Sequence, residues 1–348
     1  MEWRHPRTRL RLKRLAVGVA VCAAVVLYVL QQRRAQVTLP PPPPGWTVTR
    51  PPEAVTILLY ADGAVYAGAK DAVWRLNSAD GRVLARLDCG GSLSYVHALL
   101  RDQAGALWVG HNSGLTRFDE HGCQTFTEAD GLPATRVNAL MIDRQGRFWA
   151  GTQSGLARRD SGGWKVFKRS DGMLDDMVNV VLEDAYGAIW AGSHVAPWGG
   201  LNILENGAFR RFNLANGMPH VNIACIYEDP AGAVWVGTGF ADAGGLVRFA
   251  RRGDRWEIDR VWRRADGLAG ARVRSIFEDR DGTLWVGSEF DGVARFRNGK
   301  AVQILTTKDG MPENEATSIL QAPDGALWMS TPGGVARIDP SALARMKM

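Results

Sequence analysis

Short runs of apolar residues alternate with polar turns along the chain after about residue 50. In one stretch the runs are Val273–Glu278, Leu284–Gly287 and Gly292–Phe296, followed by a fourth around Ala301–Leu305. Asp279–Gly282 between the first two is typical of a turn, because Asp bonds its own turn and Gly accepts positive φ. The runs are continuously apolar, whereas a sheet with one face in water would alternate. The pattern predicts units of four short strands buried on both faces.

This unit recurs seven times with an aromatic residue at one fixed position. It reads ATRVNALMIDRQGRFWAGTQSGLAR at 134–158 and TSILQAPDGALWMSTPGGVAR at 317–337. The aromatic markers are Tyr66, Trp108, Trp149, Trp190, Trp235, Trp285 and Trp328. Their spacings of 42, 41, 41, 45, 50 and 43 residues match the length of a four-stranded propeller blade. The sequence therefore predicts an all-β fold, a seven-bladed β-propeller over residues 46–340.

The ends of the propeller suggest how the ring closes. The last repeat has three strands by Ile338, and only a short tail, 341–348, follows. A solenoid would need capping repeats, and the sequence shows none, whereas a ring protects its sheet edges by pairing the two chain ends. We expect residues 46–50 to supply the missing outer strand of the last blade.

The first 45 residues have the pattern of a membrane anchor and spacer. Residues 1–14 are basic, and residues 15–30 are 16 uncharged, apolar residues, which would span about 24 Å as a helix. The heavier positive charge before this run places the N-terminus in the cytoplasm. We therefore expect one transmembrane helix in a bacterial inner membrane, with the propeller in the periplasm. A cleaved signal peptide is the alternative. The proline-rich residues 31–45 predict a stiff linker.

The charge distribution argues against a nucleic-acid role. The net charge is +6, but residues 1–34 carry eight basic residues and one acidic residue, a balance of +7. The rest has 34 basic and 35 acidic residues, a balance of −1. A nucleic-acid-binding domain needs clustered positive charge on its folded surface.

The cysteines carry no metal-binding pattern. Cys22, Cys89, Cys123 and Cys225 include no C-x-x-C pair, so we predict no zinc site and no cofactor. Cys22 and Cys225 lie in apolar runs and are typical of small buried residues. Pairing of Cys89 with Cys123 is compatible with an oxidising compartment, and the sequence leaves it open.

The repeat resembles that of the two-component regulator propeller family. The segments are DQAGALWVGHNSGLTR at 102–117, DRQGRFWAGTQSGLAR at 143–158 and DRDGTLWVGSEFDGVAR at 279–295, with DGLP, NGMP and DGMP linkers at 130–133, 216–219 and 309–312. The resemblance covers about residues 53–340 and implies a periplasmic sensor, with oligosaccharide ligands in some members. Such sensors usually continue into a β-sandwich and a histidine kinase, which this sequence lacks. We therefore expect any signal to pass to a separate partner.

Loops that depart from the repeat are the first candidate ligand site, since propeller function concentrates on variable loops. The loops between second and third strands are short in blades two and three and longer in blades four, five and six. We expect these side chains on that face: His111, His194, Trp198, Phe240, Asp242, Glu289 and Phe290. The alternative is that the aromatic residues only cover neighbouring blades.

A second candidate lies at the start of each inner strand, five residues before the turn acid. These positions hold Val55, His97, Asn138, Asn179, Ala224, Arg274 and Thr317. Five of the seven are polar, and we expect them around the mouth of the central channel. The alternative is that they satisfy backbone groups and channel water.

The repeated acids Asp102, Asp143, Asp184, Asp229 and Asp279 are predicted turn caps rather than a metal cluster, because the blades radiate. No G-x-S-x-G elbow, H-E-x-x-H pair or phosphate loop occurs.

Three functions follow in order of support. The first is a membrane-anchored sensor that binds a small molecule or envelope protein and signals to a separate kinase or regulator. The second is a non-catalytic scaffold in the cell envelope. The third is a propeller lyase or hydrolase, since some lyases use His and Glu on the propeller face.

Overall fold

A computed structural model describes residues 41–346 except residue 92 and residues 194–197. The predicted anchor at residues 15–30, with residues 1–14 and most of the linker 31–45, lies outside the described residues. Within the described part, no helix is both long and apolar enough to cross a membrane.

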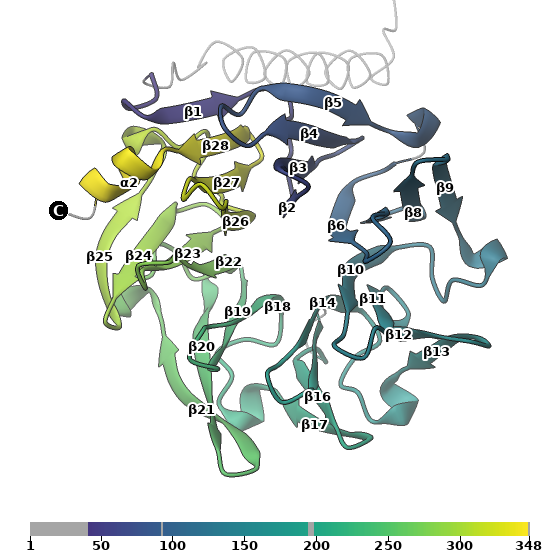
Figure 1. Cartoon of the computed structure of the whole chain (residues 1–348). Coiled ribbons are helices and arrows are strands. Elements are labelled where there is room, and N and C mark those ends of the chain that lie inside the picture. Colours follow the sequence, from purple (N-terminus) through teal and green to yellow (C-terminus); the bar gives the residue numbers. More distant parts are fainter. Residues whose placement is uncertain (1–40, 92, 194–197, 347–348) are drawn as a thin grey trace, which may run out of the picture. The chain divides into compact units, whose positions relative to one another are not determined.

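The described residues form seven antiparallel sheets of four strands each, arranged as a ring of blades (Figure 1). This is the predicted seven-bladed propeller. The innermost strands β2, β6, β10, β14, β18, β22 and β26 lie nearest the centre.

The strands of the first four blades, from inside to outside, have the following bounds. Blade one has β2 (Ile57–Ala61), β3 (Ala64–Gly68), β4 (Val73–Asn77) and β5 (Val83–Leu87). Blade two has β6 (Val96–Arg101), β7 (Leu107–His111), β8 (Gly114–Asp119) and β9 (Gly122–Phe126). Blade three has β10 (Val137–Ile142), β11 (Phe148–Thr152), β12 (Gly155–Asp160) and β13 (Gly163–Phe167). Blade four has β14 (Val178–Glu183), β15 (Ile189–Ser193), β16 (Leu201–Glu205) and β17 (Ala208–Phe212).

The remaining blades follow the same plan. Blade five has β18 (Ile223–Glu228), β19 (Val234–Phe240), β20 (Ala243–Arg252) and β21 (Arg255–Trp262). Blade six has β22 (Val273–Glu278), β23 (Leu284–Ser288), β24 (Val293–Arg297) and β25 (Lys300–Leu305). Blade seven has β26 (Ser318–Gln321), β27 (Leu327–Thr331), β28 (Gly334–Ile338) and β1 (Trp46–Thr49). The 3₁₀ turns that follow blades one to six are η1 (Cys89–Gly91), η2 (Glu128–Asp130), η3 (Arg169–Asp171), η4 (Leu214–Asn216), η5 (Arg264–Asp266) and η6 (Thr307–Asp309).

The first strand of the chain completes the last blade. β1 pairs antiparallel with β28, with Trp46 opposite Ile338 and Thr49 opposite Val335. This is the pairing that the sequence predicts for residues 46–50. Because the two chain ends share one sheet, opening the ring requires breaking that sheet.

Each aromatic marker is buried against the next blade. Trp149 packs with Ile189 and Ala191 of blade four, and Trp190 packs with Val234 and Val236 of blade five. The same arrangement recurs at all seven junctions, including Trp328 of blade seven against Leu58 and Val65 of blade one. The hydrophobic core is therefore a ring of seven similar layers between blades, which explains the continuously apolar strands.

A repeated glycine lets neighbouring blades approach closely. A Cβ atom added to Gly192 would lie 2.7 Å from Cβ of Ile223 in the next blade, and one added to Gly287 would lie 2.7 Å from the carbonyl oxygen of Ala316. Carbon atoms in contact normally stay about 3.5–4.0 Å apart. The glycine two residues after the marker in blades one to six is therefore needed to pack the next inner strand.

The turn acids do more than cap their turns. In blades two to six, the carboxylate accepts a backbone N–H through one oxygen and the indole N–H of the marker through the other. The indole Nε1 of Trp190 lies 2.7 Å from Oδ2 of Asp184, and the backbone N of Ala188 lies 3.0 Å from Oδ1. Blade seven has Ala322 at this position, and Nε1 of Trp328 is buried without a hydrogen-bond partner among the described residues.

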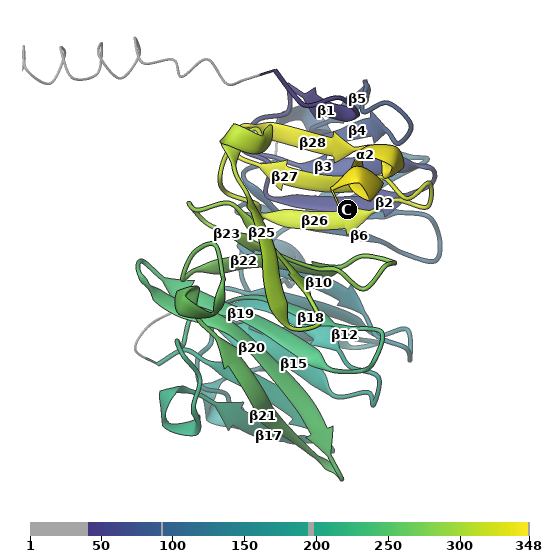
Figure 2. The same cartoon turned by 90° about the vertical axis from the view of Figure 1, so that its left-hand side faces the viewer.

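The C-terminal segment differs from the predicted tail. Residues Pro340–Arg345 form helix α2, which lies beside blade seven (Figure 2). Pro340 suits the first helical turn because the missing N–H is not needed there. Ala342 and Leu343 are buried with Trp285 and Ile338. The apolar residues of this segment therefore extend the core beyond the last strand.

Candidate functional site

A β-bulge turns one residue of the inner strand into the central channel in blades two to six. In blade two, Val96 pairs with His111 and Ala98 with Gly110, so His97 between them has no opposite residue. The same shift skips Asn138, Asn179, Ala224 and Arg274. The preceding apolar residue, such as Val96 or Val137, is buried. Bulges re-aim side chains and are frequent beside functional sites.

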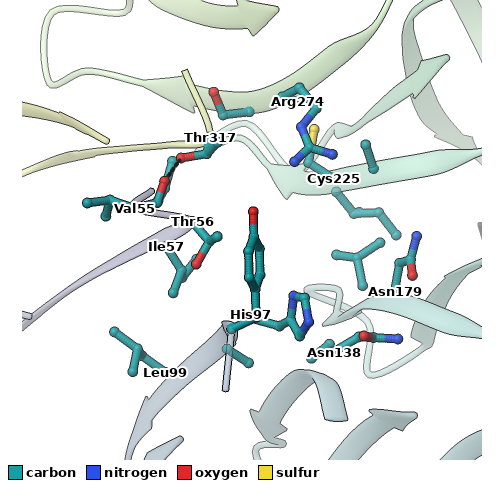
Figure 3. Close-up of a pocket in the computed structure, with 18 of the residues that line it drawn as sticks. Val55, Thr56, Ile57, His97, Leu99, Asn138, Asn179, Cys225, Arg274 and Thr317 are labelled. Atoms are coloured by element: carbon teal, nitrogen blue, oxygen red, sulfur yellow. Dashed lines mark hydrogen bonds between the residues drawn. The ribbon is translucent and has the colours of Figure 1, made fainter. Parts of the chain in front are cut away.

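The channel contains a cavity of about 550 Å³, and all seven predicted ring positions line it (Figure 3). In Figure 3 the side chains of His97 and Arg274 project toward its interior from opposite sides. The volume is within the range of small-molecule pockets, about 300–1,000 Å³. The structure thus brings together the ring of residues that the sequence predicts.

Charged and aromatic side chains that the sequence analysis missed also line this cavity. They are Tyr95, Arg136, Arg272 and Glu315. Each precedes a predicted ring residue by two positions, at His97, Asn138, Arg274 and Thr317 respectively. Alternation in extended chain carries side chains i and i+2 to one side. That spacing was the signal available in the sequence.

Two ion pairs and one amide contact hold the arginines. Arg272 pairs with Glu289, and Nε of Arg274 lies 3.3 Å from Oε1 of Glu315. Nε of Arg136 donates to Oδ1 of Asn138 at 2.7 Å. Burial lowers the pKa of Arg272, and the charge of Arg274 adds to that effect. Burial also raises the pKa of Glu315, despite the opposing effect of Arg274.

His97 is held as a neutral side chain at the same mouth. Its Nε2 lies 2.8 Å from Oδ1 of Asn112, and its ring centroid lies 5.7 Å from that of Tyr95. Burial lowers the pKa of His97, and the positive charges of Arg136 and Arg274 act in the same direction. The hydrogen bond that His97 donates to Oδ1 of Asn112 opposes these effects only in part.

The predicted loop residues have different outcomes. His111 is the last residue of β7 rather than part of a loop, and it is fully buried, with Nε2 at 2.9 Å from Oγ1 of Thr116. It is therefore unavailable to a ligand on this face, because β7 runs one residue further than expected. His194 lies outside the described residues. Neither His111 nor Trp198 lines the cavity.

Two of the three exposed aromatic loop residues, Trp198 and Phe240, lie beside arginines. Trp198 is 62% exposed, with the guanidinium of Arg169 5.8 Å from its ring centroid. Phe240 is 59% exposed, and Arg272 lies 5.7 Å from its ring. Phe290 is 68% exposed. Phe240 is thus next to the channel mouth.

The acidic loop candidates are also placed. Glu289 pairs with Arg272 and so borders the mouth. Asp242 is exposed at the tip of the hairpin between β19 and β20. The predicted long loop of blade five, 238–244, is this extended hairpin, because Thr238, Gly239 and Phe240 continue the pairing.

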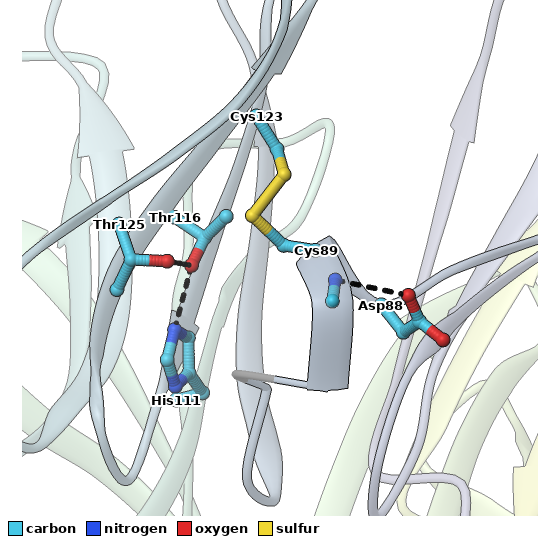
Figure 4. Close-up of a disulfide and its surroundings, with 7 residues drawn as sticks. Asp88, Cys89, His111, Thr116, Cys123 and Thr125 are labelled. Carbon is cyan, nitrogen blue, oxygen red and sulfur yellow. Dashed lines mark hydrogen bonds between the residues drawn. A yellow bond between two sulfur atoms is a disulfide. The ribbon is translucent and has the colours of Figure 1, made fainter.

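Cys89 and Cys123 form a disulfide, with Cα atoms 5.8 Å apart (Figure 4). It ties η1, which follows blade one, to β9, the outer strand of blade two. Cys225 lines the channel, and burial raises its pKa to about 12. The thiolate is the reactive form of cysteine, so Cys225 is an inert wall residue.

The described residues contain no group of three or more His, Cys, Asp or Glu side chains placed to hold a metal ion. In blades two to six the turn acid accepts hydrogen bonds from its own turn and from the indole of the marker, one acid in each of these five blades.

Comparison with known protein families finds a match to three of the repeats. The sequence model of the family described as two component regulator propeller matches residues 131–154, 217–240 and 267–290. These three segments are therefore similar to two component regulator propeller repeats. Each match covers the end of one inter-blade linker, an inner strand and the marker strand of the next blade. No match was found among curated proteins.

Propellers of known structure share the fold of this chain. The extracellular domain of BT3049 from B. thetaiotaomicron, described as a hybrid two component system, is 21% identical with a TM-score of 0.74. The match covers 88% of this chain and 42% of that one. A catalytically inactive virginiamycin B lyase from Staphylococcus aureus, solved with quinupristin, is 13% identical with a TM-score of 0.66, covering 84% and 98%.

A third similar structure comes from a secretion system. PorZ from Porphyromonas gingivalis, an essential bacterial surface component of the type-IX secretion system, is 14% identical with a TM-score of 0.62. The match covers 84% of this chain and 47% of PorZ. At these identities the comparisons establish the fold alone.

Proposed function

We propose that this chain is a sensor propeller outside the cytoplasm that binds a small polar ligand in the mouth of its channel. The observation that carries the proposal is the set of five β-bulges, which aim His97, Asn138, Asn179, Ala224 and Arg274 into one cavity of about 550 Å³. The family repeats and the likeness to an extracellular domain of a two component system support it.

The disulfide supports a location outside the cytoplasm. Disulfides persist in oxidising compartments such as the periplasm and are rare in the cytosol. The Cys89–Cys123 bridge and the predicted anchor at residues 15–30 together favour a bacterial inner-membrane protein with its propeller in the periplasm. The signal would then pass to a separate kinase or regulator, and cross-linking from membranes tests for such a partner.

A thermal-unfolding screen tests ligand binding. The full-length protein is heated with each member of a panel of neutral and acidic oligosaccharides, and at least one is expected to raise the melting temperature, because ligands that bind only the folded state stabilise it. Ala224→Trp, which fills the cavity, and Asn179→Leu, which removes a polar group from it, should lose the shift. Leu214→Trp on exposed η4 is the matched control. A panel without any shift contradicts the proposal.

Two other functions rest on weaker support. The likeness to virginiamycin B lyase and to PorZ is a likeness of fold. The proposal therefore includes no reaction and no secretion partner. Chromatography of an oligosaccharide after incubation with the protein separates these functions. A sensor should leave the oligosaccharide intact, whereas a lyase or hydrolase should convert it into smaller products.

A further inference from the structure

The channel mouth holds more positive than negative side chains. Three arginines line the cavity, Arg136, Arg272 and Arg274, and two carboxylates, Glu289 and Glu315, pair with the last two. Arg136 has no carboxylate within ion-pair distance in the part of the chain that the structure describes; its contact is the neutral amide of Asn138. One guanidinium charge at this site is therefore left without a counter-charge.

The Nε atoms of the two paired arginines, Arg272 and Arg274, have no hydrogen-bond acceptor among the described residues. Nε of Arg272 is buried and donates to no acceptor among the described residues. Nε of Arg274 faces Glu315 at 3.3 Å without the alignment of a hydrogen bond. Buried donors left without acceptors are costly, so these groups favour an acceptor that the chain itself does not provide.

Neutral groups complete the surroundings of these charges. Asn138, Asn179 and Thr317 line the cavity with polar side chains, and the rings of Tyr95 and His97 are neighbours, with centroids 5.7 Å apart. His97 adds no positive charge at neutral pH, since burial lowers its pKa. The cavity can therefore hold a polar body with one anionic group at the arginines.

We propose that the ligand of this mouth is a small molecule with a carboxylate or phosphate group, bound by Arg136 and Arg274, with its polar body against Tyr95, His97 and the ring amides. The planar guanidinium matches both oxyanions through two parallel hydrogen bonds. This inference rests on the proposed function and narrows it from a small polar ligand to an anionic one.

The test uses matched sets of sugars that differ only in the anionic group. The probes are galactose, galacturonate and galactose 1-phosphate, and glucose, glucuronate and glucose 6-phosphate, titrated into the full-length protein by calorimetry. At least one anionic member is expected to bind more tightly than its neutral counterpart. The uronate and phosphate arms distinguish the two oxyanions, and added salt is expected to weaken the binding.

Variants of Arg136 locate the binding. Arg136→Gln is expected to weaken it by about 10–100-fold, the effect of losing a charged hydrogen bond of ~1.5–3 kcal/mol. Arg136→Lys should restore part of the affinity because it restores the charge. Arg211→Gln, on the exposed outer strand β17, is the matched control and should bind as the unchanged protein does.

His97 reports the site independently of affinity. In histidine NMR spectra, a bound anion should raise the pKa of His97, because it offsets the positive charges of Arg136 and Arg274. Binding of the neutral sugars equal to that of the anions, or binding insensitive to Arg136→Gln, overturns the inference and leaves the proposed function standing. Failure of every probe here and of every oligosaccharide in the thermal screen overturns both.

Discussion

The aspartate of the repeated turn links the turn, the marker strand and the junction between two blades. Asp184 is fully buried and accepts from the backbone N of Tyr186 and Ala188 and from Nε1 of Trp190, at 2.9, 3.0 and 2.7 Å. A large aromatic ring can therefore enter the junction with its polar N–H satisfied. The repeated Asp and Trp of this sequence are one structural unit.

Removing that carboxylate should weaken the fold. Asp184→Ala leaves the buried indole N–H of Trp190 and two turn amides without their acceptor. We expect a loss of about 2–4 kcal/mol in the free energy of unfolding, because unsatisfied buried donors cost ~1–3 kcal/mol each. Urea unfolding measures it. Asp254→Ala, at an exposed turn, is the control, and an equal loss in both variants would contradict the role given to Asp184.

Blade seven offers the reverse experiment. Ala322 stands where other blades have the acid, and Nε1 of Trp328 is buried with no partner among the described residues. Ala322→Asp should supply the acceptor and raise the free energy of unfolding by about 1 kcal/mol. Denaturant unfolding of this variant checks it, and a lower stability would show that the blade-seven junction has no room for the acid.

His111 should make stability depend on pH. Burial lowers its pKa from 6.5 to about 4, so the unfolded chain binds its proton before the folded chain does. Stability should then be complete above pH 6.5 and fall as the pH drops toward 4, by about 2 kcal/mol at pH 5 from this residue alone. Unfolding of the unchanged protein and of His111→Gln at pH 7 and pH 5 measures the difference. An equal pH dependence in both contradicts this assignment.

At the scale of elements, the sequence predicted the strands that belong to the repeat and missed the helix and the bulges, which do not show in the repeat pattern. The spacing of the aromatic markers, Tyr66 and six tryptophans, predicted every blade. The third strand of the last repeat, near Ile338, had no predicted partner, which indicated that residues 46–50 would close the ring. Helix α2 was missed because six residues without a repeat give too short a pattern. The bulge at His97 was missed because a bulge depends on the register of two strands, which neither strand shows alone.

In the candidate site, too, the residues at a repeated position could be predicted and the others could not. The ring of polar residues could be predicted because one repeat position holds it. Arg136, Arg272 and Glu315 come just before the strands, where the repeat varies, and their proximity becomes visible only when the ring closes. His111 was assigned to a loop because the sequence does not show that the hairpin turn is only Asn112–Ser113.

The disulfide joins two neighbouring blades and should stabilise both. A link across 34 residues lowers the entropy of the unfolded chain by an amount worth about 3–4 kcal/mol. The Cys89→Ser/Cys123→Ser variant should therefore melt at a lower temperature than the oxidised protein. Dithiothreitol should lower the melting temperature of the unchanged protein to that of the variant and leave the variant as it is. Equal melting with and without reductant would contradict a formed bridge.

At the scale of the whole propeller, seven similar junctions support one dissimilar channel mouth. The junctions repeat a single packing scheme, so their residues are explained by stability. The mouth carries the unrepeated charges, Arg136, Arg272, Arg274 and Glu315, on a rigid ring. Function on such scaffolds concentrates where the sequence varies, and this is the basis of the sensor proposal.

Hydrogen–deuterium exchange of the full-length protein, with and without a ligand found in the thermal screen, tests the central claim most directly. The account predicts slower exchange on binding in the segments that begin the inner strands, at residues 95–99, 136–140 and 272–276, and no change in the outer strands β13, β17 and β21. Protection confined to the outer strands, or to the opposite ends of the inner strands, would contradict a ligand site at the channel mouth.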